Sequence, residues 1–420
     1  MGGGKLGGGK VGGNRFLVIS SCEGMISWLQ SLGMWNEPQT GLPAVSKKRR
    51  INEEVIQPIQ AVRVARGNFF QDVTGVTEVV FRQNPAQYFR QDEHGYDILT
   101  NARTGHVWNA GRFEQASVVD LAQRAGALAV SGIPGRFNVV VGFNTPALAQ
   151  ADQRRLDVAA LQAAPEHHGA VFQVASNFDC LEGPGRNVTA YAHALAQGEA
   201  AAVSAAPGSI ARVYAHAGID LLDGVDELPD LVAGRLNLTV LAPNALQQAA
   251  GFNYDDIALG IQQDTQPAFG FITNRGGLHD RCNIAGQRIT QIYTSGVNLG
   301  LNGLNHDIAT IAQKALQAAY EGSIHAAAIY GQQRAGDQPR ERQELFLTLV
   351  GCGVFGNDLG WVDQALQPCM QFIIDYGLDV TLIVFDGNAR SAPGAMPMNN
   401  FLASMRQLVA DTGGNFEELR

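Results

Sequence analysis

Leu345-Phe-Leu-Thr-Leu-Val350 runs directly into Gly351-Cys-Gly-Val-Phe-Gly-Asn357, and the architecture follows from this segment. The apolar run is too short and too rich in β-formers for a helix, and it does not alternate, which predicts a strand covered on both faces. A helical pattern from Trp361 to Tyr376 and a second strand-like run from Leu378 to Phe385 follow. The order strand, glycine loop, helix, strand predicts an α/β fold.

The loop between the first strand and the helix carries three glycines, Gly351, Gly353 and Gly356. Without a Cβ, backbone N–H groups there can approach a ligand closely. The unpaired N–H groups at the start of the next helix add partial positive charge. This arrangement predicts a phosphate-binding loop. The alternative is that the glycines only form a tight turn.

The length, net charge and apolar runs of the chain limit the classes of function that it can have. The 420 residues suffice for one large domain with additions or for two domains. A net charge of −9 does not favour nucleic acid as a partner, and an anionic ligand would have to be held by local geometry. No apolar run reaches the ~20 residues of a membrane-spanning helix. We therefore expect neither nucleic-acid nor membrane partners.

Five cysteines are scattered, and no pair has metal-ligand spacing: Cys22, Cys180, Cys282, Cys352 and Cys369. This pattern predicts no disulfide framework and no metal site. A reducing compartment fits, so we expect a cytoplasmic protein. Cys352, inside the glycine loop, is interpreted as a space-filling side chain rather than a nucleophile.

Three regions are expected along the chain. Residues 1–14 form a flexible glycine-rich lead. Residues 15–130 form an α+β N-terminal extension, with extended pieces at Ala61–Val64 and Glu78–Phe81 and a helix from Ser117, which can cap it, to Gly126. Residues 131–420 form the main domain.

The main domain alternates predicted strands and helices around one sheet. Further strands are expected at 137–143, 170–175, 235–241, 269–273 and 288–298, and helices at 196–214 (broken or kinked at Pro207 and Gly208), 305–319 and 399–411, with 325–330 leading into a polar loop. The fold class is therefore a mixed α/β sheet between helices. Ligands bind where strand C-termini gather, here the ends at Asn177, Asn298 and Gly351.

A dinucleotide-binding fold is the first alternative. Gly351-Cys-Gly-Val-Phe-Gly356 matches G-x-G-x-x-G between a strand and a helix. Only one further strand clearly follows, and the nearest acid for a ribose, Asp386, comes later than the motif requires. An NAD-dependent oxidoreductase is therefore the less favoured reading.

Three stretches together resemble the macrodomain family, which binds ADP-ribose. Phe172-Gln-Val-Ala-Ser-Asn-Phe-Asp179 is similar to the strand and loop that contact adenosine and ribose in the family. Gln197-Gly-Glu-Ala-Ala-Ala-Val203 is similar to the helix start beside the distal ribose. Leu347–Asn357 is similar to the loop around the diphosphate. The resemblance implies a macrodomain-like fold with ADP-ribose as ligand and no cofactor. It implies these ligand-binding residues: Asn177, Phe178, Asp179, Gln197, Gly198, Gly351, Cys352, Gly353, Val354, Phe355, Gly356 and Asn357.

Within the family, the sequences at 173–182 and 351–357 resemble a divergent, poly(ADP-ribose) glycohydrolase-like branch. This branch includes a bacterial effector that removes ADP-ribose from arginine. The resemblance implies an ADP-ribosylated protein as partner, and the host cytosol as location if this chain is also a secreted effector. The chain departs from the glycohydrolases because its helix start lacks a full glycine triplet and an adjacent Glu-Glu pair. The catalytic carboxylate therefore cannot be assigned from that motif.

Three aspartates are the catalytic candidates: Asp255, Asp256 and Asp264. Cleavage of an N-glycosidic bond passes through an oxocarbenium-like state that a carboxylate stabilises, while a second carboxylate can hold the leaving group. The alternative for these aspartates is a solvated turn, and for Glu199 an exposed helix position. Two functions remain in competition, an ADP-ribosyl-acceptor hydrolase with arginine linkage favoured, and a binding module that reads ADP-ribose without cleaving it.

Overall fold

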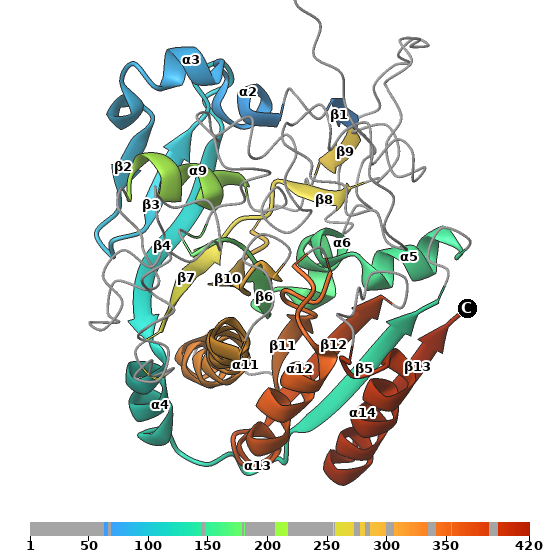
Figure 1. Ribbon diagram of the computed structural model, residues 1–420. Helices are drawn as coiled ribbons and strands as arrows, with labels where there is room; N and C mark the ends of the chain where they lie inside the picture. The colour runs from blue at the N-terminus through green and yellow to red at the C-terminus, as the bar shows by residue number, and fades with distance from the viewer. Residues whose placement is uncertain are drawn as a thin grey trace, which may run out of the picture. The chain divides into compact units, whose positions relative to one another are not determined.

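The computed structural model gives the arrangement of the chain from residue 63 onward, with gaps (Figure 1). The chain divides into two units, Met1–Ser46 with Asn274–Gly276, and the remainder. The first unit lies outside the described residues, as do the predicted lead at 1–14 and the predicted strand at 235–241. The residues described are 63–65, 69–143, 148–178, 180, 206–216, 255, 257–272, 278–281, 286–299, 306–334, 342–353, 355–385 and 394–420.

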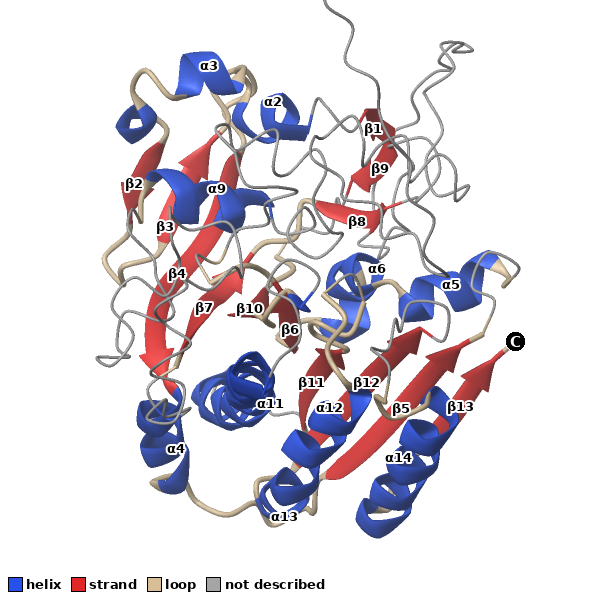
Figure 2. Cartoon of the chain, viewed as in Figure 1, coloured by secondary structure: helices blue, strands red, loops and turns tan. Residues whose placement is uncertain are grey.

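A ten-stranded sheet organises the second unit (Figures 1 and 2). One half is parallel, in the order β13 (Phe416–Leu419), β5 (Arg136–Gly142), β12 (Leu378–Phe385), β11 (Gln343–Thr348), β6 (Val171–Ala175) and β10 (Ile289–Thr294). The other half continues antiparallel, in the order β7 (Ala258–Thr265), β4 (Val107–Ser117), β3 (Asp97–Thr100) and β2 (Phe89–Gln91). A separate antiparallel sheet joins β1 (Arg63–Ala65), β9 (Leu278–Arg281) and β8 (Phe269–Ile272).

Helices cover both faces of the large sheet. One face carries α4 (Val118–Gly126), α11 (His306–Arg334), α12 (Leu359–Leu366), α13 (Met370–Asp375) and α14 (Met398–Thr412) (Figure 2). The other face carries α5 (Gln150–Leu156), α6 (Val158–Ala163) and α9 (Ala206–Tyr214), and α9 contacts α2 (Phe69–Thr74), which is followed by α3 (Glu78–Phe81). Short 3₁₀ turns lie at Pro85–Gln87, Pro165–His167 and Gln367–Cys369.

Strand β7 packs against helices on both of its faces. Leu259 packs against Gly322 of α11, where a Cβ would lie 2.6 Å from Leu259 Cδ1. Gln262, on the opposite face, accepts a hydrogen bond from Arg212 of α9. Both faces are buried, which is why the strand carries no alternating pattern.

Much of the expected framework is confirmed. The predicted mixed α/β sheet between helices is present, and the runs at 137–143, 170–175, 345–350 and 378–385 form β5, β6, β11 and β12. The helix after Ser117 is also confirmed, because Ser117 Oγ accepts the backbone N–H of Asp120 at the start of α4.

Other expectations were wrong. Glu78–Phe81, expected to be extended, forms the short helix α3. The segment 325–330, expected to lead into a loop, belongs to α11, which continues to Arg334 because it contains no proline and its alanines pack closely on the sheet. The expected break at Pro207 in a helix over 196–214 is not tested, because 196–205 lies outside the described residues; α9 is described from Ala206, with Pro207 in its first turn, where the missing N–H has no helical partner to lose.

The expected N-terminal extension shares the sheet of the main domain. Strands β2, β3 and β4 continue the sheet beyond β7, and β4 pairs with β7 from Arg112 to Ser117. Leu121 and Ala125 of α4 lie in the same hydrophobic cluster as Phe137 of β5. From residue 69 to 130 the described chain is therefore continuous with the main domain in both sheet and core.

Ser117→Ala should lower the free energy of unfolding by about 1 kcal/mol, because the cap of α4 loses its acceptor. Urea denaturation measures this change. Ser117→Asp is the matched control, since it keeps an acceptor and adds a negative charge at the helix start, and it should stay within about 0.5 kcal/mol of the parent. Equal losses in both variants would contradict the assigned cap.

Candidate functional site

Three strand ends meet at one edge of the sheet. β6 lies between β10 and β11 and runs parallel to both. Its last residue, Ala175, is in register with Thr294, the last residue of β10. The chain therefore leaves toward Asn177, Asn298 and Gly351 from the same edge, as expected from the sequence.

The loops that follow β10 and β11 touch each other across the end of β6. A Cβ on Gly296 would lie 3.0 Å from Gly351 Cα. Asn357 Nδ2 donates to the carbonyl oxygen of Val297 at 2.8 Å and to that of Gly351 at 3.0 Å. Because β6 holds the two strands about 10 Å apart, this bridge fixes the shape of the edge above it.

The turn itself requires two of the loop glycines. Gly351 has a φ of +73° and Gly356 a φ of +74°, a region that side chains disfavour. A Cβ on Gly351 would also lie 2.9 Å from Asn357 Nδ2. The tight-turn explanation therefore accounts for Gly351 and Gly356 whether or not a ligand binds.

Some backbone amides of the same loop are bonded and others are not, and the N–H of Asn357 donates to the carbonyl oxygen of Gly351 at 3.0 Å. The N–H groups of Cys352 and Gly356 donate to backbone oxygens at 3.2 Å. Those of Gly351, Gly353 and Phe355 have no acceptor among the described residues. Successive unpaired amides in a turn can converge on an anion.

Buried polar side-chain atoms gather at this edge without partners. Asn177 and Asn357 are only 4% and 1% exposed. An unsatisfied buried polar atom costs about 1–3 kcal/mol, so several at one edge indicate a polar ligand. Within the described part of the chain, such atoms at this edge are Asn177 Nδ2, Thr294 Oγ1, Thr348 Oγ1 and Asn357 Oδ1, and Thr265 Oγ1 and His325 Nδ1 lie elsewhere.

The helix after the loop contributes less than expected. Asp358 caps α12, and its Oδ1 accepts the N–H groups of Gly360 and Met396, each at 2.8 Å. A carboxylate therefore already compensates the positive end of this helix. Any anion at this edge would be held by the loop amides rather than by the helix dipole.

Cys352 fills space. It is 1% exposed, and its Sγ lies 3.6 Å from the carbonyl oxygen of Val350. Burial raises the pKa of its thiol to about 12. A thiol that stays protonated at neutral pH is a poor nucleophile.

The candidate carboxylates do not form one group. Asp264 lies at the end of β7, and Asp255 precedes the start of that strand. β7 runs antiparallel to β10, and Thr265 is in register with Ile289, the first residue of β10. Asp255 is therefore on the side of the strand C-termini, whereas Asp264 is about 20 Å away along the extended strand.

Asp264 has a local structural role. Its φ of +55° coincides with a register shift between β7 and β10, which marks a β-bulge. Tyr96 OH donates to Asp264 Oδ2 at 3.0 Å. The bulge and the tyrosine explain this residue without reference to the edge at Asn177.

The remaining predicted site residues are of two kinds. Phe178 is 4% exposed and belongs to the main hydrophobic cluster, whereas Phe355 is half-buried and its carbonyl oxygen accepts Leu299 N–H at 2.9 Å. The others lie outside the described residues: Asp179, Gln197, Gly198, Asp256 and Val354, together with Glu199.

Sequence reasoning missed two side chains of the edge, Thr294 and Thr348. Each is the last residue of a strand, β10 and β11 respectively. Thr348 was hidden because the predicted strand continued past it to Val350, and only an earlier strand end at this one polar residue of the run would have found it by the rule that selected Asn177. Thr294 was hidden because the predicted strand continued past it to 298.

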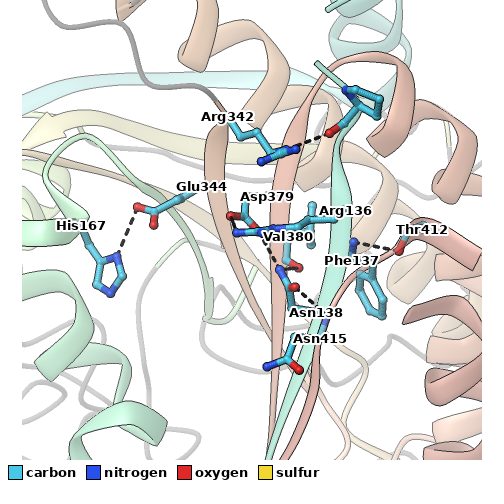
Figure 3. A network of polar contacts seen from close by, with 11 residues as sticks. Arg136, Phe137, Asn138, His167, Arg342, Glu344, Asp379, Val380, Thr412 and Asn415 are labelled. Carbon is cyan, nitrogen blue, oxygen red and sulfur yellow. Dashed lines mark hydrogen bonds and ion pairs between the residues drawn. The ribbon is translucent and has the colours of Figure 1, made fainter. Parts of the chain in front are cut away.

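A hollow of about 400 Å³ lies at the opposite end of β5 and β12. Arg136 makes two hydrogen bonds to Asp379, and Asn138 Nδ2 also donates to Asp379 (Figure 3). Asn138 Oδ1 accepts the N–H of Asn415 at 3.0 Å. Because these groups satisfy one another, the hollow is a junction between β5, β12 and the turn before β13, and it lies away from the strand C-termini.

Across the described ranges, no group of three or more His, Cys, Asp or Glu side chains is arranged to hold a metal ion. In the same ranges, no helix is both long and apolar enough to cross a bilayer.

Comparisons with known proteins find similar solved structures. No protein-family model and no curated protein matches the chain. The poly(ADP-ribose) glycohydrolase of Deinococcus radiodurans in complex with ADP-ribose is similar, with 15% sequence identity over 71% of this chain and 94% of that chain and a TM-score of 0.38. The poly(ADP-ribose) glycohydrolase of Thermomonospora curvata is similar with 16% identity over 82% of this chain and 98% of that chain and a TM-score of 0.37.

Asn357→Ala should lower the free energy of unfolding by about 1–3 kcal/mol, because the carbonyl oxygen of Val297 loses its buried donor and that of Gly351 keeps only the backbone N–H of residue 357. Urea denaturation measures the loss. Asn400→Ala, at an exposed position of α14, is the matched control and should change stability by less than about 0.5 kcal/mol. A neutral Asn357→Ala variant would show that the bridge does not hold the two loops.

Cys352 should resist alkylation by iodoacetamide at pH 8 in the folded protein, because its buried thiol, with a pKa near 12, remains protonated there. Mass spectrometry of the peptide that contains Cys352 measures the labelling. The same peptide should be labelled fully in urea, which serves as the control. Rapid labelling of the folded protein would contradict the assigned burial.

Proposed function

We propose that this protein is a hydrolase that removes ADP-ribose from modified protein side chains, by cleaving the N-glycosidic bond at the distal ribose, with arginine as the favoured acceptor. The observation that supports this best is the coincidence, at one sheet edge, of unpaired loop amides and partnerless buried side chains. The loop would hold the diphosphate, and the side chains would meet the polar atoms of the sugars.

The diphosphate part of the proposal rests on backbone dipoles. The N–H groups of Gly351, Gly353 and Phe355 are available in a loop that Asn357 holds in place. Fixed amides can bind phosphate oxygens without a cationic side chain. Such local binding suits a chain whose net charge of −9 would otherwise repel an anion.

The sugar part rests on complementarity. The unpaired Asn177 Nδ2 is a donor, the unpaired Asn357 Oδ1 is an acceptor, and the hydroxyls of Thr294 and Thr348 can serve as either. Ribose hydroxyls and the adenine edge offer both kinds of partner. The choice of ADP-ribose among nucleoside diphosphates rests on the sequence resemblance to macrodomains at 172–179 and 347–357.

Asp255 and Asp256 are the proposed acids. Asp255 precedes β7 on the side of the strand C-termini. One carboxylate would stabilise the positive charge on the ribose or activate water, and the other would hold the leaving group. A guanidinium leaving group is planar and cationic, and a carboxylate can bind it through two hydrogen bonds.

A module that binds ADP-ribose without cleaving it is the second candidate. The observation that favours it is the position of Asp264, which is held by Tyr96 at the far end of β7. With this residue removed from the edge, the site has one fewer candidate carboxylate. Binding would still use the same loop and the same side chains.

Calorimetry with ADP-ribose tests the shared part of both candidates, and incubation with a protein ADP-ribosylated on arginine separates them. Asp255→Asn and Asp256→Asn should each lower the release of ADP-ribose by about 100-fold or more, while Asp264→Asn, the matched control, should retain turnover. Binding without release would favour the module. Absence of ADP-ribose binding to the parent protein would overturn the proposal.

A further inference from the structure

Arg212 on α9 is a buried cation. It is 2% exposed and ranks among the largest fully buried side chains of the described residues. Its Nε donates to the carbonyl oxygen of Cys180 at 3.3 Å, its Nη1 to Gln262 Oε1 at 3.3 Å, and its Nη2 to Ser209 Oγ at 3.0 Å. The guanidinium lies over the ring of Tyr293, 3.6 Å from the ring centroid.

All of these partners are neutral. Among the described residues Arg212 forms no ion pair with a carboxylate. A buried charge without a counterion is expensive, and an apolar side chain of similar volume often stabilises a core equally well. Stability alone therefore does not explain an arginine here.

The guanidinium joins segments that are far apart in the chain. Its acceptors come from the segment after β6, from β7 and from α9 itself, and its aromatic partner comes from β10. A planar fork can donate in three directions while it stacks on a ring, which a lysine ammonium cannot do. The segment after β6 begins at the edge described above, and β10 ends there.

The segment after β6 adopts a constrained turn. Cys180 N–H donates to the carbonyl oxygen of Asn177 at 3.0 Å, and Cys180 has a φ of +59°. Cys180 is also confined from the side, since a Cβ on Gly260 would lie 2.2 Å from its Sγ. A non-glycine residue keeps such a φ only when its surroundings hold it. Arg212 bonds the carbonyl of this residue.

We propose that Arg212 is a positioning residue for the ADP-ribose site, holding the turn from Asn177 to Cys180 in the conformation that leaves the Asn177 side-chain amide available at the edge. This inference rests on the proposed function. The candidate site then has two parts that are held separately. Arg212 holds the part with Asn177, whereas Asn357 holds the loop that carries the amides of Gly351, Gly353 and Phe355.

Arg212→Lys keeps the charge but removes the fork. It should weaken ADP-ribose binding by about tenfold or more, because the turn that carries Asn177 loses its anchor. Binding of inorganic pyrophosphate should stay within about twofold of the parent, since the glycine loop is unchanged. Calorimetry with each compound gives the ratio of the two affinities, which a general loss of stability would not change selectively.

Hydrogen exchange without any ligand supplies a second measurement. In Arg212→Lys, peptides that cover 176–180 should exchange faster than in the parent, whereas peptides that cover 343–353 should not change. Arg406→Lys is the matched control, because Arg406 also stacks on an aromatic ring, Phe416, at 3.7 Å, and is half exposed at the far side of the sheet. It should alter neither affinity nor exchange at 176–180.

Ser209→Ala covers the case in which Arg212→Lys does not fold. It removes one acceptor of the fork and should weaken ADP-ribose binding by about threefold while pyrophosphate binding holds. The inference is overturned if folded Arg212→Lys binds ADP-ribose within twofold of the parent, or if both affinities fall together. A parent protein that binds neither compound would overturn the proposed function, and the exchange measurement would still decide the role of Arg212.

Discussion

The site depends on one buried amide, the side chain of Asn357. It spans the loops that follow β10 and β11 by donating to Val297 and Gly351. Because β6 ends between those strands, the bridge joins the loops on either side of the strand end that leads to Asn177. A Cβ on Gly296 would lie 3.0 Å from Gly351 Cα, so a side chain there would push the two loops apart. The positions of the loop amides are thus a consequence of this bridge.

Strand direction decides which polar residues can cooperate. The parallel strands β6, β10 and β11 bring side chains from positions as far apart in the sequence as 177 and 357 to one edge. β7 runs antiparallel to β10. Asp255 and Asp264, only nine positions apart, therefore lie at opposite ends of β7. Proximity in sequence is a poor guide to a site when a strand lies in between.

The sequence predicted the strands and the glycine loop because their signals are local. It did not predict β7, whose residues are nearly all buried and include Gln262, Gln263 and Asp264, so that neither alternation nor an apolar run marks the strand. It predicted Asn357 as a ligand-binding residue but not that its Nδ2 donates to two backbone carbonyl oxygens. It expected a free helix start where Asp358 supplies a cap. The bond from Asn357 to Val297 joins segments 60 positions apart, which no local pattern reveals, whereas the Asp358 cap is local and could have been expected from an aspartate just before a helix.

An anion at this edge would interact with backbone dipoles rather than with positively charged side chains. The segments 176–180, 294–299 and 348–358 contain no lysine or arginine. The cation joined to this edge, Arg212, is buried and bonded to neutral groups. A pyrophosphate held by amides leaves no mobile positive side chain to repel a cationic group nearby. Under the proposed function, an arginine-linked substrate would carry such a group on the ribose that follows its diphosphate, and a binding site built from backbone dipoles would suit both ends of that molecule, where a cluster of lysines would favour only the diphosphate.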